Sequence, residues 1–206
     1  SRSRPGGDAP GRHGLLPRPA PAALWPDLRG HLTLGEDGRA APHAYVIALG
    51  SNMRTHGLSP EAIITAATEA LGENGWNVRA VSPTIRSVPV GPSQRRYANA
   101  AALIEGNRPP EMALAELQEI EHRFGRQRRG QRWRARPLDL DIVLWNGGAF
   151  ASDRLTIPHP LFRQRDFVLR PAAAIAPHWR DPVSGLKVRQ LAARLVRPRI
   201  RNLETT

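Results

Sequence analysis

Apolar residues recur with two different spacings along the chain, and each spacing predicts one type of secondary structure. Residues 44–49 form a short apolar run that is typical of a buried strand, and residues 50–52 favour a turn after it. Beyond Ser59 the apolar positions recur every three or four residues, which predicts a helix that Ser59 caps, Pro60 begins and Gly72 ends. Its apolar stripe consists of Ile63, Ala66, Ala67, Ala70 and Leu71.

The next apolar segments alternate with turn residues and predict strands. Residues 76–81 and 84–88 indicate a second strand that Pro83 interrupts, because proline cannot donate a hydrogen bond to a neighbouring strand. A loop over residues 89–96 then leads to a third strand over residues 97–104.

A second helix and a further strand complete the pattern. Pro109 and Pro110 open the helix and Gly125 ends it. Its apolar residues, at intervals of four, three and four, are Ala113, Leu117, Ile120 and Phe124. Residues 138–145 form the last strand, so the order is strand, helix, strand, strand, helix, strand. That order predicts an α+β, ferredoxin-like βαββαβ fold whose antiparallel sheet carries helices on one face and leaves the other open for a site.

C-terminal additions follow this unit. Residues 146–148 favour a turn, residues 154–165 a loop with a short helix, and residues 186–195 a last helix. The whole of residues 43–196 is therefore expected to form one domain.

The two ends of the chain differ from this domain in composition. Residues 1–42 hold seven of the 20 prolines and seven of the 18 glycines without sustained apolar periodicity, which predicts a disordered tail. Residues 197–206 form a short basic tail.

Composition limits the possible function classes. The 206 residues include no cysteine, which excludes disulfides, thiolate metal sites and cysteine nucleophiles. No stretch approaches the roughly 18 apolar residues of a membrane span. The formal net charge is +12 and Lys187 is the only lysine, so arginine carries almost all of the positive charge. That excess indicates anionic partners, either nucleotides or nucleic acids.

Two carboxylates and a cluster of arginines stand next to each other in the sequence. Because side chains alternate along a strand, Asp139 and Asp141 project from one face while the leucines and the isoleucine around them enter the core. Positions two apart lie roughly 6.6–7 Å from each other, which suits two hard cations about 3.5–4 Å apart on a phosphate chain. Seven arginines between Arg123 and Arg136 precede the pair. Phosphoryl transfer needs both groups side by side: carboxylates that bind metal ions, and arginines that neutralise the charge of the phosphates.

Each half of this arrangement also has an ordinary explanation. An Asp-x-Asp on a half-buried strand is more often a solvated face than a metal site. An arginine cluster is usually a solvated surface or a nucleic-acid patch. Their adjacency favours the catalytic interpretation, because salt bridges would otherwise simply neutralise the acidic pair.

Three longer motifs resemble one enzyme family. They are Gly125-Arg126-x-Arg128, Arg132-Trp133-x-x-Arg136-x-Leu138-Asp139-Leu140-Asp141-Ile142, and Leu155-Thr156-Ile157-Pro158-His159-Pro160. Together they resemble the 6-hydroxymethyl-7,8-dihydropterin pyrophosphokinases, folate-pathway enzymes that move a pyrophosphoryl group from ATP to a pterin alcohol. The resemblance spans residues 45–188, and its central motif is long and specific.

The resemblance implies roles for the residues around the nucleotide. Asp139 and Asp141 would hold two Mg²⁺ ions, and Arg126 and Arg136 would join them as catalytic residues. The implied ATP-binding residues are Gln118, Glu121, Arg128, Arg132, Trp133, Arg154, Thr156, His159 and Arg165. Of these, Gln118 and Glu121 lie three apart on one helix face, off the apolar stripe, where polar residues are ordinarily exposed. Stabilisation of phosphate charge is favoured over a general-base role for the histidine.

It also implies a pterin site. The rings of Tyr97 and Phe167 would sandwich the heterocycle, and the amide of Asn99 would read its edge. The backbone at Ser87, Val88 and Val90 would supply further hydrogen bonds. On residue type alone both aromatics would be assigned to the core, yet Asn99 lies on the same strand face as Tyr97.

We therefore expect a cytoplasmic, monomeric transferase that uses ATP, two Mg²⁺ ions and a reduced pterin and releases AMP, with no nucleic-acid or membrane partner. A ferredoxin-like RNA-binding module is the rival from another class. The K/R-G-F/Y-G/A-F-V-x-F/Y pattern of such modules is absent from the sequence. A two-metal nuclease is a weaker alternative.

Overall fold

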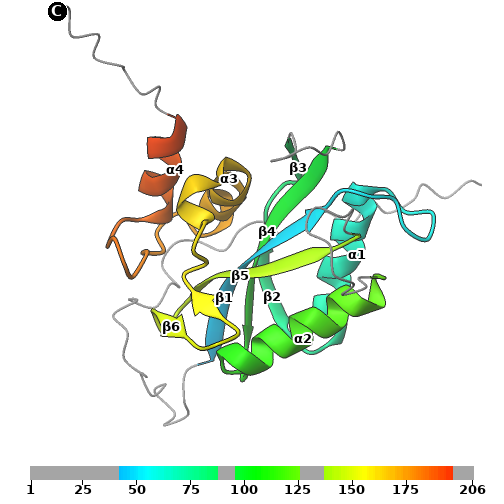
Figure 1. The fold of residues 1–206 in the computed structure, drawn as a ribbon, viewed down its shortest axis with the longest axis horizontal. Helices are drawn as coiled ribbons and strands as arrows, with labels where there is room; N and C mark the ends of the chain where they lie inside the picture. Colours follow the sequence, from blue (N-terminus) through cyan, green and yellow to red (C-terminus); the bar gives the residue numbers. More distant parts are fainter. Residues whose placement is uncertain (1–41, 88–95, 126–136, 197–206) are drawn as a thin grey trace, which may run out of the picture.

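A computed structural model of the chain describes residues 42–87, 96–125 and 137–196. Its centre is a five-stranded antiparallel sheet in the order β2-β4-β1-β5, with β3 also paired to β4 (Figure 1). The strands are β1 (His43–Ser51), β2 (Asn77–Val81), β3 (Ile85–Ser87), β4 (Tyr97–Gly106) and β5 (Asp139–Trp145). The expected ferredoxin-like α+β architecture is confirmed. The two predicted tails lie outside the described residues, apart from residue 42.

Two helices cover one face of the sheet, as the sequence predicts. They are α1 (Pro60–Glu73) and α2 (Pro110–Arg123). The expected cap of α1 is present, because the Ser59 hydroxyl accepts a hydrogen bond from the Ala62 amide over 3.2 Å. Ile63 and Leu71 of α1 and Leu117 of α2 pack with the apolar side chains of β1, β4 and β5 in the larger of two hydrophobic cores.

C-terminal helices cover part of the opposite face, which the sequence pattern left open. Helix α3 (Asp166–Ile175) and helix α4 (Val188–Val196) lie on the far side of the sheet from α1 and α2 (Figure 1). Helix α3 falls in a region to which the sequence assigned no element. Its interior Pro171 is the physical reason, because proline inside a helix removes a hydrogen bond and normally predicts a break.

A small hairpin and a single 3-10 turn connect β5 to α3. The hairpin pairs β6 (Phe150–Ala151) with β7 (Thr156–Ile157), where the sequence predicted only a loop. The short helix expected in that loop exists as the 3-10 helix η2 (Phe162–Gln164). None of the helices in the described ranges is long and apolar enough to cross a membrane.

A buried ion pair fastens these additions together. Asp181, between α3 and α4, is fully buried and accepts a 2.7 Å hydrogen bond from Nε of Arg163 in η2. The same carboxylate accepts hydrogen bonds from the amides of Val183 and Ser184 and from the Ser184 hydroxyl. The Asp181 side chain thereby stabilises the turn before α4 and links it to η2.

Candidate active site

One face of the sheet changes from apolar to polar along three neighbouring strands. Near α3 this face presents Val46 and Leu103, which are buried in the second hydrophobic core with α3 and α4. Further along the same strands it presents Gly50, Asn99 and Asp139, with Gly50 paired to Asn99 on one side and to Asp139 on the other. The polar part of the face therefore brings together residues that lie far apart in the sequence.

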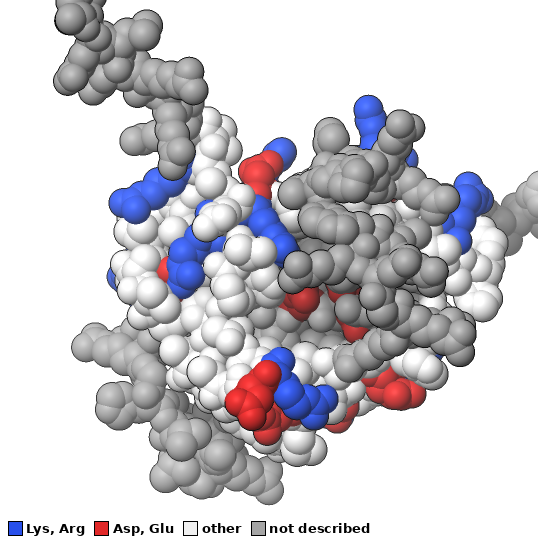
Figure 2. Space-filling view, in the orientation of Figure 1, with Lys and Arg blue, Asp and Glu red and all other residues white. Residues whose placement is uncertain are grey.

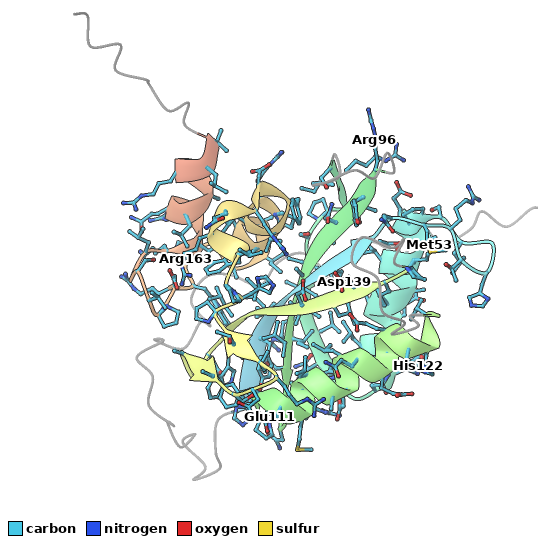
Figure 3. All side chains as sticks on the ribbon, viewed as in Figure 1. Met53, Arg96, Glu111, His122, Asp139 and Arg163 are labelled. Atoms are coloured by element: carbon cyan, nitrogen blue, oxygen red, sulfur yellow. The ribbon has the colours of Figure 1, made fainter. Side chains whose placement is uncertain are left out.

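The carboxylate pair occupies this polar part. Asp139 and Asp141 are half-buried, whereas Leu138, Leu140 and Ile142 are buried in the core on the other face. The predicted alternation along the strand is thus confirmed. Asp139 lies near the centre of the molecule in Figure 3, and acidic atoms lie in a central hollow of the described surface in Figure 2.

The outer edge of β5 has no further strand beside it among the described elements, since β5 ends the sheet order. Groups from α2 and from the segment after β7 form hydrogen bonds with the backbone of β5 at that edge instead. The Leu140 amide donates a 2.7 Å hydrogen bond to Oε1 of Glu121 on α2. The Val143 carbonyl accepts a 3.1 Å hydrogen bond from the His159 amide. Backbone groups of an edge strand need such partners when they are buried.

Glu121 differs from its sequence-based expectation in placement. It was expected off the apolar stripe of its helix, yet it is only 2% exposed and lies among the buried residues of α2. The 3.6-residue repeat accounts for this, because Glu121 lies four positions after Leu117 on the same face. Its contact with a nucleotide stays a prediction.

His159 faces the carboxylates from the segment after β7. Its Nε2 lies 4.0 Å from Oδ2 of Asp141, and its Nδ1 accepts a 3.1 Å hydrogen bond from the Leu161 amide. Since Nδ1 is an acceptor, the proton of the neutral ring is on Nε2 and points to the acidic side. This arrangement makes the imidazole a hydrogen-bond donor to the site.

Burial lowers the pKa of His159 below its ordinary value. Asp141 and Asp139 act in the opposite direction and raise this pKa, whereas Arg165 lowers it. Arg165 therefore lies within electrostatic range of the same imidazole. The structure thus brings four of the predicted residues, two carboxylates, a histidine and an arginine, into one site.

The described residues of the predicted pterin site lie on β3, β4 and α3. Asn99 donates a 2.9 Å hydrogen bond from Nδ2 to the Ser87 hydroxyl, and Tyr97 is paired with Ser87 across β3 and β4. Phe167 is half-buried in the first turn of α3, and the Arg165 guanidinium carbon lies 5.8 Å from the centre of its ring. Their contact with a pterin stays a prediction.

Gly50 is a residue that sequence reasoning assigned to a turn, although it belongs to β1. A Cβ at this position would lie 3.7 Å from Oδ1 of Asn99 and 3.9 Å from Cβ of Asp139. Any larger side chain would therefore stand between the amide and the carboxylate. The signal that could have found it is a glycine inside an otherwise apolar strand, which often marks a close approach of a ligand.

Gly50→Val is expected to weaken pterin binding by at least about tenfold, which corresponds to roughly 1.4 kcal/mol. The reason is that its methyl groups enter the space between Asn99 and Asp139, while a β-branched residue suits the strand itself. Titration of the reduced pterin followed by fluorescence measures the effect. Gly50→Ala, whose Cβ makes only ordinary contacts, is the control and should bind more nearly like wild type. Unchanged pterin affinity in both variants with intact folding would contradict this placement.

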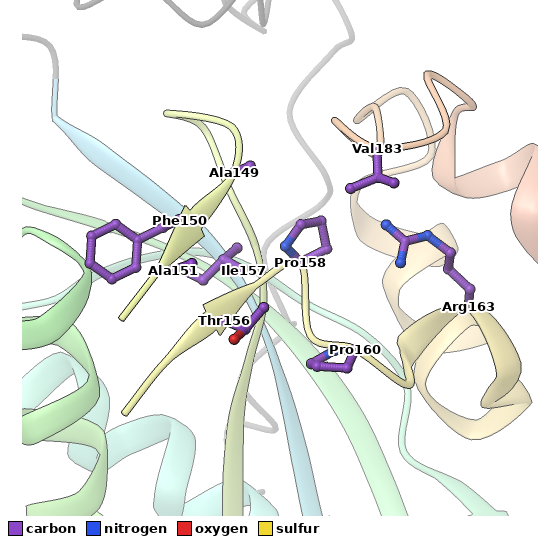
Figure 4. Close-up of a pocket in the computed structure, with 9 residues that line it drawn as sticks. All are labelled: Ala149, Phe150, Ala151, Thr156, Ile157, Pro158, Pro160, Arg163 and Val183. Carbon is purple, nitrogen blue, oxygen red and sulfur yellow. The ribbon is translucent and has the colours of Figure 1, made fainter. Parts of the chain in front are cut away.

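Three further predicted residues lie on the elements that flank β5. Gln118 is half-buried on α2, Thr156 is exposed on β7, and Arg154 is exposed in the hairpin before it. A cavity of about 490 Å³ lies beside this hairpin, with Arg163 and Val183 on its opposite wall (Figure 4). Among the described residues that line it, Thr156 is the only predicted site residue, and neither Asp139 nor Asp141 belongs to this lining.

Several predicted residues lie outside the described ranges. They are Val88, Val90, Arg126, Arg128, Arg132, Trp133 and Arg136.

The donor set suits a hard divalent cation. Among the described residues no group of three histidine, aspartate or glutamate side chains converges on one metal position. Mg²⁺ does not need such a cage, because it commonly binds one or two carboxylates together with substrate phosphates and water. Two half-buried carboxylates on one strand face fit that mode.

Comparisons with known proteins agree on one family. A family model described as 7,8-dihydro-6-hydroxymethylpterin-pyrophosphokinase matches residues 46–177. The 2-amino-4-hydroxy-6-hydroxymethyldihydropteridine pyrophosphokinase of Synechocystis sp. is 38% identical over 149 residues, covering 72% of this chain and 74% of the relative. The protein of the same name from Haemophilus influenzae is 41% identical over 132 residues, covering 63% of this chain and 79% of the relative.

The fold is also similar to solved structures. The crystal structure of Plasmodium falciparum HPPK-DHPS wild type with pteroate matches with a TM-score of 0.59 at 13% identity, covering 76% of this chain. The match spans 43% of that longer chain, which is less than half of its length. At this identity the likeness concerns the fold alone.

Proposed function

The chain belongs to the 7,8-dihydro-6-hydroxymethylpterin-pyrophosphokinase family, and from this membership we infer that it transfers pyrophosphate from ATP to 6-hydroxymethyl-7,8-dihydropterin in folate biosynthesis. The products are AMP and the pterin diphosphate. The use of two Mg²⁺ ions, and action as a monomer without nucleic acid or membrane, belong to the same proposal.

The observation that carries this proposal is the pairing of Gly50 with both Asn99 and Asp139. Neighbouring strands lie about 4.8 Å apart, so the backbones of Asn99 and Asp139 are separated by roughly 9–10 Å across β1. A bicyclic ring with a hydroxymethyl arm spans such a distance. A pterin ring that is hydrogen-bonded to the Asn99 amide would therefore extend its hydroxymethyl group toward phosphates that are bound near Asp139.

The described residues fall into two groups, those that would bind the pterin and those that would neutralise the charge of the phosphates. Tyr97 and Phe167 would stack on the pterin faces, and Asn99 would hydrogen-bond its edge, which fixes the attacking hydroxyl in line with the β-phosphorus. His159, with its proton on Nε2, would donate to a phosphate oxygen, and Arg165 would neutralise phosphate charge. Mg²⁺ held by Asp139 and Asp141 would supply Lewis-acid neutralisation of the phosphate chain.

The nucleotide product tests this function directly. With ATP, Mg²⁺ and the reduced pterin alcohol, we expect one AMP and one pterin diphosphate for each ATP consumed, because attack falls on the central phosphorus and the α-phosphate leaves with the nucleoside. Chromatography of the nucleotides measures the ratio, and a reaction without pterin is the control for hydrolysis. Stoichiometric ADP would contradict pyrophosphoryl transfer even if the pterin became phosphorylated.

A further inference from the structure

Glu121 places a carboxylate in the interior of the protein, directly behind the predicted metal-binding strand. The side chain is 2% exposed and extends from α2 to the edge of β5. Burial of a carboxylate is costly unless hydrogen bonds compensate it. Here Oε1 accepts a 2.7 Å hydrogen bond from the Leu140 amide, and a bond to an ionised acceptor is stronger than one between neutral groups.

Leu140 stands between Asp139 and Asp141, so its peptide unit determines how the two carboxylates are presented. The side chain of Leu140 is buried among the core residues, 4% exposed, while its amide points to the edge of the sheet where Glu121 meets it. The register pairs Leu140 with Leu49 of β1 on the other side of β5. The peptide is thus held from the core, from the neighbouring strand and from α2 at once.

We propose that Glu121 is a positioning residue for the Asp139/Asp141 pair, acting through the Leu140 amide. By fixing this peptide it sets the direction and separation of the two carboxylates before any cation arrives. The inference rests on the proposed function for the identity of the ligand, Mg²⁺ with nucleotide phosphates. It assigns to Glu121 a task inside the protein that does not depend on contact with the nucleotide.

Three substitutions separate the hydrogen bond from charge and packing. Glu121→Gln keeps an acceptor oxygen at the same reach and loses the charge. Glu121→Leu keeps the approximate volume and loses the acceptor, and Glu121→Asp keeps the charge but withdraws the oxygen by one methylene. The matched control is Glu116→Gln on the same helix, whose carboxylate pairs with Arg108 over 2.7 Å instead of with β5.

The first readout uses the substrate-free protein. Amide hydrogen exchange followed by NMR should show the Leu140 amide protected in wild type, Glu121→Gln and Glu116→Gln, and exchanging at least about tenfold faster in Glu121→Leu and Glu121→Asp. This measurement needs no activity, so it tests the hydrogen bond even if the reaction were a different one.

The second readout is the Mg²⁺ concentration for half-maximal activity. Loss of a residue that orients a metal ligand typically costs about 10–100-fold in metal affinity, and we expect such a shift for Glu121→Leu and Glu121→Asp, a clearly smaller one for Glu121→Gln, and none for the control Glu116→Gln. KM for the pterin should change little, because Tyr97 and Asn99 belong to β4. A residue that only stabilised the fold would lower the unfolding midpoint without moving the Mg²⁺ requirement.

The inference is overturned if Glu121→Leu and Glu121→Asp keep the wild-type Mg²⁺ requirement, or if Glu121→Gln is as impaired as they are. If Glu121→Leu does not fold, the comparison of Glu121→Asp with Glu121→Gln decides the question in the same way. Failure of the proposed function would look different, since wild type itself would then form no AMP from ATP and the pterin.

Discussion

Asp139→Asn and Asp141→Asn are each expected to lower turnover by about 10³-fold, which corresponds to roughly 4 kcal/mol of lost transition-state stabilisation. Both side chains lie on the polar face of β5, half-exposed, while the residues that hold the strand lie on the opposite face. An asparagine keeps the size of the side chain and removes the negative charge that a hard cation needs. The unfolding midpoint should therefore change little.

Steady-state rates at saturating ATP and pterin over a range of Mg²⁺ concentrations measure this effect. Asp153→Asn is the matched control, because Asp153 is an exposed carboxylate in the hairpin between β6 and β7 and should tolerate the change. Near-normal turnover of both site variants at high Mg²⁺ would rule out the metal role. A large loss of folding stability in both variants would instead show that the two carboxylates stabilise the fold.

The carboxylate strand could be predicted from sequence because its signal is local. Alternation along residues 139–142 depends only on strand geometry, and the burial pattern follows it residue by residue. The Ser59 cap and the paired prolines that open α2 are local signals as well, and both helices begin where these residues predict. Such features need no knowledge of what packs against them.

Other parts of the site depend on contacts between distant segments and could not be predicted in this way. Whether Glu121 is exposed or buried depends on where β5 passes α2, which a helix pattern alone does not contain. Gly50 reads as a turn residue until its pairing with Asn99 and Asp139 is known. Helix α3 was hidden by Pro171, whose cost is offset by burial of Val168, Leu169 and their neighbours against the sheet.

Arg163→Met is expected to lower the free energy of unfolding by about 3–5 kcal/mol at pH 7, because it leaves the fully buried Asp181 carboxylate without its cation. Methionine replaces much of the side-chain volume, so loss of packing contributes less. Chemical denaturation measures the effect. The control is Arg170→Met, which removes a surface pair with Asp166 whose side chains are 59% and 52% exposed, and should cost less than about 1 kcal/mol.

The pH dependence of this loss distinguishes the ion pair from packing. Burial by itself raises the pKa of Asp181, but hydrogen bonds from Arg163, Ser184 and the Val183 amide together hold it below its ordinary value. A carboxylate with a lowered pKa in the folded state stabilises the protein above its unfolded pKa of about 3.9, and this contribution is lost as the pH falls through the folded pKa. In Arg163→Met the pKa of Asp181 rises, because burial then has less opposition.

The difference in unfolding free energy between wild type and Arg163→Met should therefore be largest near pH 7 and should shrink as the pH falls, because Asp181 becomes protonated first in the variant and only at lower pH in wild type, where its pKa is lowered. A cavity or a lost apolar contact would give a difference that does not vary with pH. Denaturation curves at several pH values between 7 and 3 decide between the two. A constant difference would show that Arg163 stabilises the C-terminal additions through packing, as in the contact of its guanidinium carbon 4.7 Å from the centre of the Phe162 ring, and not through its ion pair with Asp181.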